Sequence, residues 1–246
     1  MPSFKARLLT FVLRNRHVLK GQFWKPKPVD WMAYESIIKF REEVEKGAAR
    51  FGKIPEGIET ERVQIGDMPA EWIRPSGATD DATILYFHGG GYVSGTISAH
   101  RAIVAKFVDG SKVRALLFEY RLAPEHPFPA ALDDAIAAYQ WLLDQGIAPG
   151  KIAFVGDSGG AGLILATLLK LRDQGAALPT SAAVISPVTD FTCSGKSYVT
   201  NARLCLSPEG MGPACGKHYA GGADLTNPYI SPLFCDLHGL PPLLIY

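Results

Sequence analysis

The segment Gly156-Asp157-Ser158-Gly159-Gly160 carries the strongest chemical signal in the chain. The pattern G-x-S-x-G is weak evidence by itself, because glycine and serine are common. Its surroundings strengthen it, since residues 152–155 predict a buried strand before it and residues 159–172 predict an apolar helix directly after it. Such a strand–turn–helix connection projects a serine Oγ clear of the sheet, at a helix N-terminus whose N–H groups stabilise negative charge. We therefore predict that Ser158 is a nucleophile.

Two other uses of a glycine-rich turn fit this segment less well. A phosphate-binding loop requires a lysine followed by serine or threonine after the glycines, whereas Ala161-Gly162-Leu163 stands there. The glycines also lack the G-x-G-x-x-G order of a dinucleotide site. The nucleophile remains the favoured interpretation.

A second glycine-rich segment, His88-Gly89-Gly90-Gly91-Tyr92, follows the predicted strand 83–87. Three glycines after a buried strand allow backbone N–H groups to turn inward with no side chain in the way. Together with Gly159 they predict an oxyanion hole, in which Gly90, Gly91 and Gly159 donate and Gly89 shapes the turn. A flexible glycine loop is the alternative. His88 is interpreted as a structural anchor of this loop.

The elements that position these segments alternate along the chain. Strands are predicted at residues 82–87, 113–118, 151–155, 182–185 and 243–246, and helices at 99–108, 130–143 and 159–172. Before them, residues 1–53 predict helices around a proline-rich break, and residues 63–73 predict a hairpin. Short apolar strands that alternate with helices indicate an α/β fold with a mostly parallel central sheet and helices on both faces.

Composition limits the possible partners and cofactors. The net charge of +1 gives no electrostatic support for nucleic-acid binding, and no run of eighteen apolar residues predicts a membrane span. None of the four cysteines forms a C-x-x-C pair, and no histidine cluster accompanies them at zinc spacing, so we predict no metal site. Four reduced thiols in a cytoplasmic protein are expected.

The first twenty residues are basic and contain no acidic residue. Phe4, Leu8, Phe11 and Leu13 fall near helical spacing. A basic amphipathic helix can lie on a membrane surface, or its apolar face can dock on its own protein. The second arrangement is favoured, because most amphipathic helices in globular chains are of that kind.

Three segments resemble the hormone-sensitive-lipase family of esterases: His88–Tyr92, the block Tyr120-Arg121-Leu122-Ala123-Pro124-Glu125-His126-Pro127, and Gly156–Gly160. The resemblance implies an α/β-hydrolase fold, no cofactor, and hydrolysis of small-molecule carboxylic esters with short or medium acyl chains through an acyl-enzyme on Ser158. It also implies a helical cap from residues 1–53, and a core over residues 54–246 into which residues 191–230 insert a second cap segment. A homo-oligomer remains possible. Arg121 and Glu125 are expected to form a polar network that fixes the loop around them.

The resemblance has one serious departure. The family's aspartate follows the strand that begins near Leu243 and its histidine comes later, so the triad acid and base, with the last strands and helix, are not in the printed chain. His218 and His238 both precede that strand and are poor substitutes. The chain as printed is therefore expected to be inactive or strongly impaired. A catalytically incomplete or ligand-binding homologue of the same fold is the alternative function.

Overall fold

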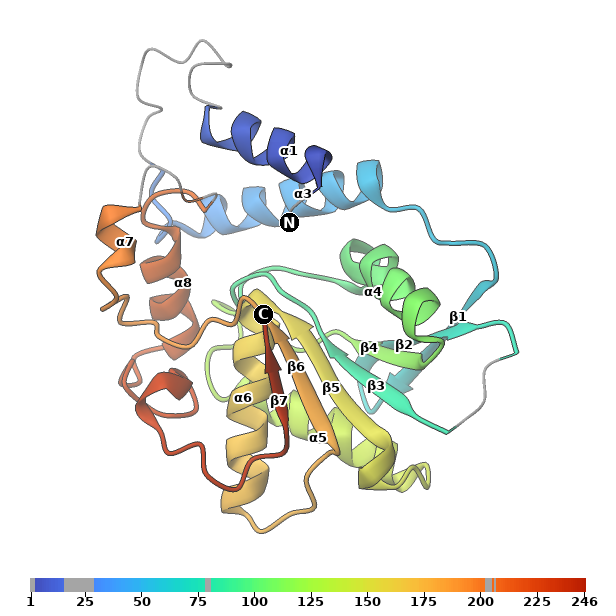
Figure 1. Ribbon diagram of the computed structural model, residues 1–246. Helices are drawn as coiled ribbons and strands as arrows, with labels where there is room; N and C mark the ends of the chain where they lie inside the picture. Colours follow the sequence, from blue (N-terminus) through green and yellow to red (C-terminus); the bar gives the residue numbers. More distant parts are fainter. Residues whose placement is uncertain (1–2, 16–28, 78–80, 202–204, 206) are drawn as a thin grey trace.

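The computed structural model describes residues 3–15, 29–77, 81–201, 205 and 207–246 of the chain (Figure 1). Its centre is a seven-stranded sheet in the order β1-β2-β4-β3-β5-β6-β7. The strands are β1 (Ile58–Ile65), β2 (Met68–Pro75), β3 (Thr83–Phe87), β4 (Arg114–Phe118), β5 (Ile152–Asp157), β6 (Ser181–Ile185) and β7 (Leu243–Ile245). The β1–β2 hairpin joins β4 in antiparallel pairing, and the other neighbours are parallel. The predicted mostly parallel sheet is confirmed.

Helices cover both faces of the sheet because alternate strand residues are buried on opposite sides. Leu85 and Phe87 pack in one apolar cluster with α5 (Ala130–Asp144) and α6 (Ser158–Asp173). Ile84 and Tyr86 pack in a second cluster with α4 (Ile97–Ser111). A strand that is buried on both faces reads as a continuous apolar run, which is why period-two alternation is missing from its sequence. Each predicted core helix and strand is present, with small differences at its ends.

Two groups of helices lie outside this layered core. The first comprises α1 (Phe4–Arg14) and α3 (Tyr34–Phe51), and the second comprises the short α7 (Ser197–Thr200) and α8 (Met211–Ala220) within residues 191–230. Single 3-10 turns lie at Pro149–Lys151 and Pro232–Phe234. The helices predicted within residues 1–53 are confirmed as α1 and α3, whereas the proline-rich break between them lies outside the described residues.

Helix α8 is not evident from the sequence, because glycine and proline interrupt its helical pattern. Burial of Met211, Cys215 and Tyr219 on one side stabilises the helix instead. Tertiary packing here overrides a weak local propensity.

The strand register brings the two glycine-rich segments to the same edge of the sheet. Strands β3 and β5 are parallel neighbours, with Phe87 opposite Gly156. His88 and Asp157 therefore leave adjacent strands at the same level. The carboxyl edge of a parallel sheet is where open α/β folds form their ligand crevices.

Candidate active site

Ser158 occupies a strained turn between β5 and α6. Its φ of +52° is in the left-handed region, which non-glycine residues rarely adopt. Glycines on either side make the close turn possible, since a Cβ on Gly156 would lie 2.5 Å from the Phe87 carbonyl oxygen and one on Gly160 would lie 2.2 Å from it. The Ser158 side chain is part-exposed at the first residue of α6. This is the geometry that the sequence predicts for a nucleophile.

The glycine loop after β3 turns back on itself with backbone angles that suit glycine. Gly90 and Gly91 have φ values of +127° and +63°, and the Gly90 carbonyl accepts hydrogen bonds from the N–H groups of Val93 and Ser94. A Cβ on Gly90 would lie 2.0 Å from the Ser94 carbonyl oxygen. No described residue accepts a hydrogen bond from the N–H of Gly90 or Gly91, so both groups are available to a ligand oxygen.

The first turn of α6 lies directly against this loop. A Cβ on Gly159 would approach the backbone nitrogens of Gly91 and Tyr92 to 3.0 and 3.2 Å. No described residue accepts a hydrogen bond from the Gly159 N–H either. The glycine loop and the first turn of α6 are thus packed together beside Ser158, as an oxyanion hole built from Gly90, Gly91 and Gly159 would require.

Asp157 holds this arrangement together, a role that the G-x-S-x-G pattern alone does not predict. Its Oδ1 accepts hydrogen bonds from the Gly89 N–H at 3.1 Å and from the Tyr86 hydroxyl at 3.0 Å. Because the Gly89 N–H is occupied, it is not available to an oxyanion. Gly89 instead shapes the turn, in agreement with the sequence prediction. The sequence does contain a signal for this role. A carboxylate stands one residue before the serine, within reach of the neighbouring parallel strand.

His88 is an anchor of the loop, as predicted. It is fully buried, its Nδ1 lies 2.9 Å from the Gly89 carbonyl oxygen, and its ring stacks on Tyr120 with centroids 4.1 Å apart. Burial, together with the nearby His100, lowers the pKa of His88 to about 3. An imidazole that stays neutral at ordinary pH can orient the loop, but it is poorly matched to proton transfer.

Helix α8, within residues 191–230, packs against the glycine loop. Tyr92, with φ +64°, stacks on Tyr219 with ring centroids 3.8 Å apart. The Cys215 thiol faces Gly91, where an added Cβ would lie 3.0 Å from its Sγ. Burial raises the pKa of Cys215 to about 11, so this thiol is protonated at neutral pH and is not a rival nucleophile.

Helix α3 is fastened to the other side of the site by Arg41. Its guanidinium donates to both carboxylate oxygens of Glu125 at 2.7 Å, to the Val93 carbonyl at 2.7 Å and to the Ala123 carbonyl at 3.0 Å. The Tyr34 hydroxyl also donates to Glu125. The Arg41 hydrogen bonds lower the pKa of Glu125 to about 2. Arg41 therefore joins α3 to the end of the glycine loop and to the loop that carries Ala123 and Glu125.

The expected network of Arg121 and Glu125 is in fact two separate networks. Arg121 pairs with Asp134 at 2.8 Å, and its side chain is half-exposed. Glu125 points away from it to Arg41. No local pattern predicts this pairing, because Arg41 and Glu125 are 84 positions apart.

None of the described histidines is hydrogen-bonded to Ser158. His218 lies on α8, where its Nε2 contacts the Trp31 carbonyl oxygen at 2.8 Å and so links α8 to the segment before α3. Its nitrogen is therefore engaged in a structural contact.

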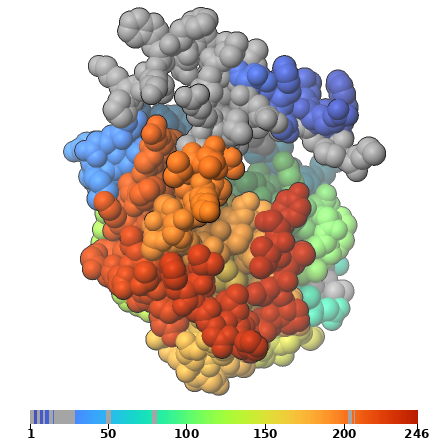
Figure 2. Space-filling model, turned by 60° about the vertical axis from the view of Figure 1, so that its left-hand side comes forward, coloured from blue at the N-terminus to red at the C-terminus, as the bar shows by residue number. Residues whose placement is uncertain are grey.

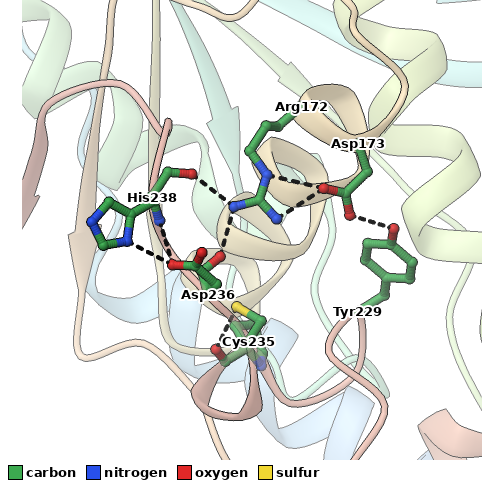
Figure 3. A network of polar contacts seen from close by, with 7 residues as sticks. Arg172, Asp173, Tyr229, Cys235, Asp236 and His238 are labelled. Atoms are coloured by element: carbon green, nitrogen blue, oxygen red, sulfur yellow. Dashed lines mark hydrogen bonds and ion pairs between the residues drawn. The ribbon is translucent and has the colours of Figure 1, made fainter.

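His238 and Asp236 form a histidine–carboxylate pair, but at the wrong end of α6 (Figure 3). Their Nδ1 and Oδ1 atoms lie 2.8 Å apart, and their backbone carbonyls accept hydrogen bonds from Arg172. Arg172 stands at the C-terminal end of α6, whereas Ser158 is the first residue of that helix. At 1.5 Å per residue the two ends are about 21 Å apart, so this pair cannot receive the Ser158 proton.

Within the described part of the chain, no group of three or more histidine, cysteine or carboxylate side chains is placed to hold a metal ion. Among the same residues, no helix is both long and apolar enough to cross a membrane.

Comparisons with known proteins agree with this geometry. A family model described as having the alpha/beta hydrolase fold matches residues 84–246. An acetyl-hydrolase of Streptomyces hygroscopicus is 45% identical over 184 residues, which cover 74% of this chain and 61% of that protein. An esterase of Acinetobacter venetianus is 33% identical over 190 residues, which cover 76% of this chain and 62% of that protein. The chain thus spans less than two thirds of the length of these curated relatives.

Solved structures are similar over nearly the whole chain. A crystal structure of EstE5 soaked with p-nitrophenyl butyrate superposes with a TM-score of 0.86 at 42% identity, covering 99% of this chain and 78% of that one. A crystal structure of an esterase from the bacterial hormone-sensitive lipase family gives a TM-score of 0.84 at 36% identity, covering 100% of this chain and 78% of that one.

Proposed function

Because the chain belongs to the hormone-sensitive-lipase family of α/β-hydrolases, we propose that it is part of a carboxylesterase whose nucleophile is Ser158. The observation that carries the proposal is the left-handed turn at Ser158 beside the backbone N–H groups of Gly90, Gly91 and Gly159. Together these groups would supply a nucleophile and an anion-binding site at one edge of the sheet, which is the requirement of acyl transfer.

In the proposed reaction the Ser158 Oγ attacks the ester carbonyl and transfers its proton to a general base. The carbonyl oxygen becomes an oxyanion and is stabilised by the N–H groups of Gly90, Gly91 and Gly159. The alcohol leaves with a proton, and the acyl group stays on Ser158 until water releases the acid. Loss of one such donor typically costs about 2.7–4 kcal/mol of transition-state stabilisation.

The proposed substrates are esters with short or medium acyl chains. Support comes from relatives described as acetyl-hydrolases and an ethyl acetate hydrolase, and from the butyrate ester used with EstE5. The alternative of a ligand-binding homologue is less well supported, since these relatives are described as hydrolases and the glycine loop and Ser158 turn are intact in this chain.

Residues 1–53 and 191–230 are proposed as the two parts of a cap that limits acyl length. Their described helices meet the glycine loop through Arg41 on one side and through Cys215 and Tyr219 on the other. Deletion of residues 1–50 is expected to change acyl-chain preference or to expose apolar surface. Unchanged specificity and solubility after this deletion would contradict the cap proposal.

A fluorophosphonate probe tests the nucleophile. We expect it to label the complete protein, with the triad acid and base present, on Ser158, and we expect Ser158→Ala to abolish labelling. Ser186 provides a matched control, since it follows the neighbouring strand β6, has φ +47° and is more exposed than Ser158. It lacks the helix N-terminus and the glycine loop, so Ser186→Ala should leave labelling intact. Labelling that survives Ser158→Ala would refute the assignment.

A further inference from the structure

Helix α1 presents an apolar face to solvent instead of to the protein. Phe4, Leu8, Phe11 and Val12 are 80%, 51%, 62% and 40% exposed. Phe4, Leu8 and Phe11 are spaced by four and three residues, which places them on one side of the helix. Among the α1 residues whose side chains the structure describes, none belongs to either apolar cluster of the core. The favoured sequence interpretation, in which this face docks on the protein, is therefore wrong for Phe4, Leu8 and Phe11, whereas the side chain of Leu13 lies outside the described part of the structure.

The position of α1 leaves this face accessible. The helix lies at the periphery of the molecule, on the far side of α3 from the sheet in Figure 1 and at the upper edge in Figure 2. It packs extensively against none of the other described helices and strands. A contiguous row of large exposed apolar side chains marks an interaction site.

The charge around this face indicates what covers it. Helix α1 contains Lys5, Arg7 and Arg14 and no acidic residue, and the first acid in the sequence is Asp30. On a helical projection, the exposed Arg7 falls on one flank of the Phe4–Leu8–Phe11 stripe. Apolar side chains flanked by cations are suited to an interface of hydrocarbon and anionic headgroups.

We propose that α1 is an interfacial anchor that binds the protein reversibly to the surface of an anionic lipid bilayer. Aromatic rings enter the boundary of the acyl chains, while the flanking cations stay at the phosphate level. A second copy of the chain is a poorer occupant, because two α1 helices face to face would bring like charges together. The helix has eleven residues and lies on the membrane without crossing it.

Vesicle co-sedimentation tests the proposal with two lipid compositions, pure phosphatidylcholine and an equal mixture of phosphatidylcholine and phosphatidylglycerol. The chain should partition at least tenfold more strongly into the mixed vesicles, and raised salt should weaken this binding. A Phe4→Ser, Phe11→Ser double variant should lose at least tenfold in partitioning, because each ring contributes apolar area to the bound state. Arg7→Glu should reduce the preference for phosphatidylglycerol.

Val199→Ser is the matched control, since Val199 is 82% exposed but lies on α7. It should bind vesicles like the unchanged chain, and unchanged thermal unfolding of all variants shows that they fold. Equal binding of the double variant, or no preference for the anionic vesicles, would overturn the proposal. If the chain bound no vesicles but self-associated, and the double variant abolished that self-association, the occupant of the α1 face would be a second copy and the membrane proposal would be overturned. If the chain bound only an acidic peptide, the occupant would be a protein partner and the membrane proposal would likewise be overturned.

Discussion

The Asp157 carboxylate accepts a hydrogen bond from the Gly89 N–H at 3.1 Å, and so fastens the residue before Ser158 to the glycine loop. The same oxygen accepts the Tyr86 hydroxyl. Both donors use Oδ1, so an asparagine oxygen at this position can serve both.

Asp157→Ala should therefore reduce kcat/KM for a short-chain aryl ester by about 10–100-fold, because the buried Gly89 and Tyr86 donors lose an acceptor, at about 1–3 kcal/mol. Asp157→Asn should recover most of the activity. The measurement is steady-state kinetics on the complete protein, with the triad acid and base present. Equal losses in both variants would show that the negative charge matters and not the acceptor.

Gly159 and Gly160 are adjacent but should respond differently to alanine. At Gly160 a Cβ would lie 2.2 and 2.4 Å from the carbonyl oxygens of Phe87 and His88, and backbone atoms cannot move aside easily. Gly160→Ala should destabilise the fold by about 1–3 kcal/mol or more.

At Gly159 the nearest atom would be 3.0 Å away, so a shift of a few tenths of an ångström accommodates the methyl group. Gly159→Ala should leave the thermal midpoint almost unchanged. Differential scanning calorimetry of the two variants separates these outcomes, and similar midpoints would contradict the distinction.

The ion pair of Arg41 and Glu125 should make stability depend on acid pH. The folded pKa of Glu125, about 2, lies below its ordinary value of 4.5, so its contribution is fully present above about pH 4.5. That contribution is lost as the pH falls from about 4.5 towards 2. Glu125→Gln should show a smaller loss of unfolding free energy across this window than the unchanged chain, measured by denaturant titration. Parallel curves for the two proteins would contradict the assignment.

The Ser158 proton should not be taken by His238 or His218. His238→Ala changes a pair about 21 Å from Ser158 along α6 and should leave fluorophosphonate labelling within about twofold. His218→Ala removes a contact with the Trp31 carbonyl and should alter cap stability more than labelling. Abolished labelling in either variant would identify a base that the geometry does not support.

The four cysteines should titrate as thiols after denaturation without reductant. In the native protein the exposed Cys205 should react with a thiol reagent much faster than the buried Cys215, whose raised pKa keeps it protonated. A pair protected from the reagent after denaturation would overturn this prediction, and with it the predicted cytoplasmic location.

Local sequence predicted the core of this fold well because its signals are local. A buried strand, a glycine pattern and an apolar helix are contiguous around Ser158, and the same is true of the glycine loop after Phe87. Helix α8 was not predicted because the packing of Met211, Cys215 and Tyr219 stabilises it, and such packing cannot be read from the sequence pattern alone. The partnership of Arg41 and Glu125 escaped for a related reason, since it joins distant segments. The exposure of Phe4 and Phe11 likewise depends on tertiary structure, because helical spacing shows which residues share a face but not what that face contacts.

The hydrogen bonds of Arg41 would affect the outcome of exchanging the N-terminal helices between relatives. The guanidinium holds Val93 at the end of the glycine loop as well as Glu125 and Ala123. A chimaera with its junction at residue 53 would therefore replace a support of the anion-binding loop together with the helices. Grafted helices that lack an arginine at the position of Arg41 would alter turnover as well as substrate range. The effect on turnover can be separated from the effect on substrate range only when Arg41 is retained in the graft.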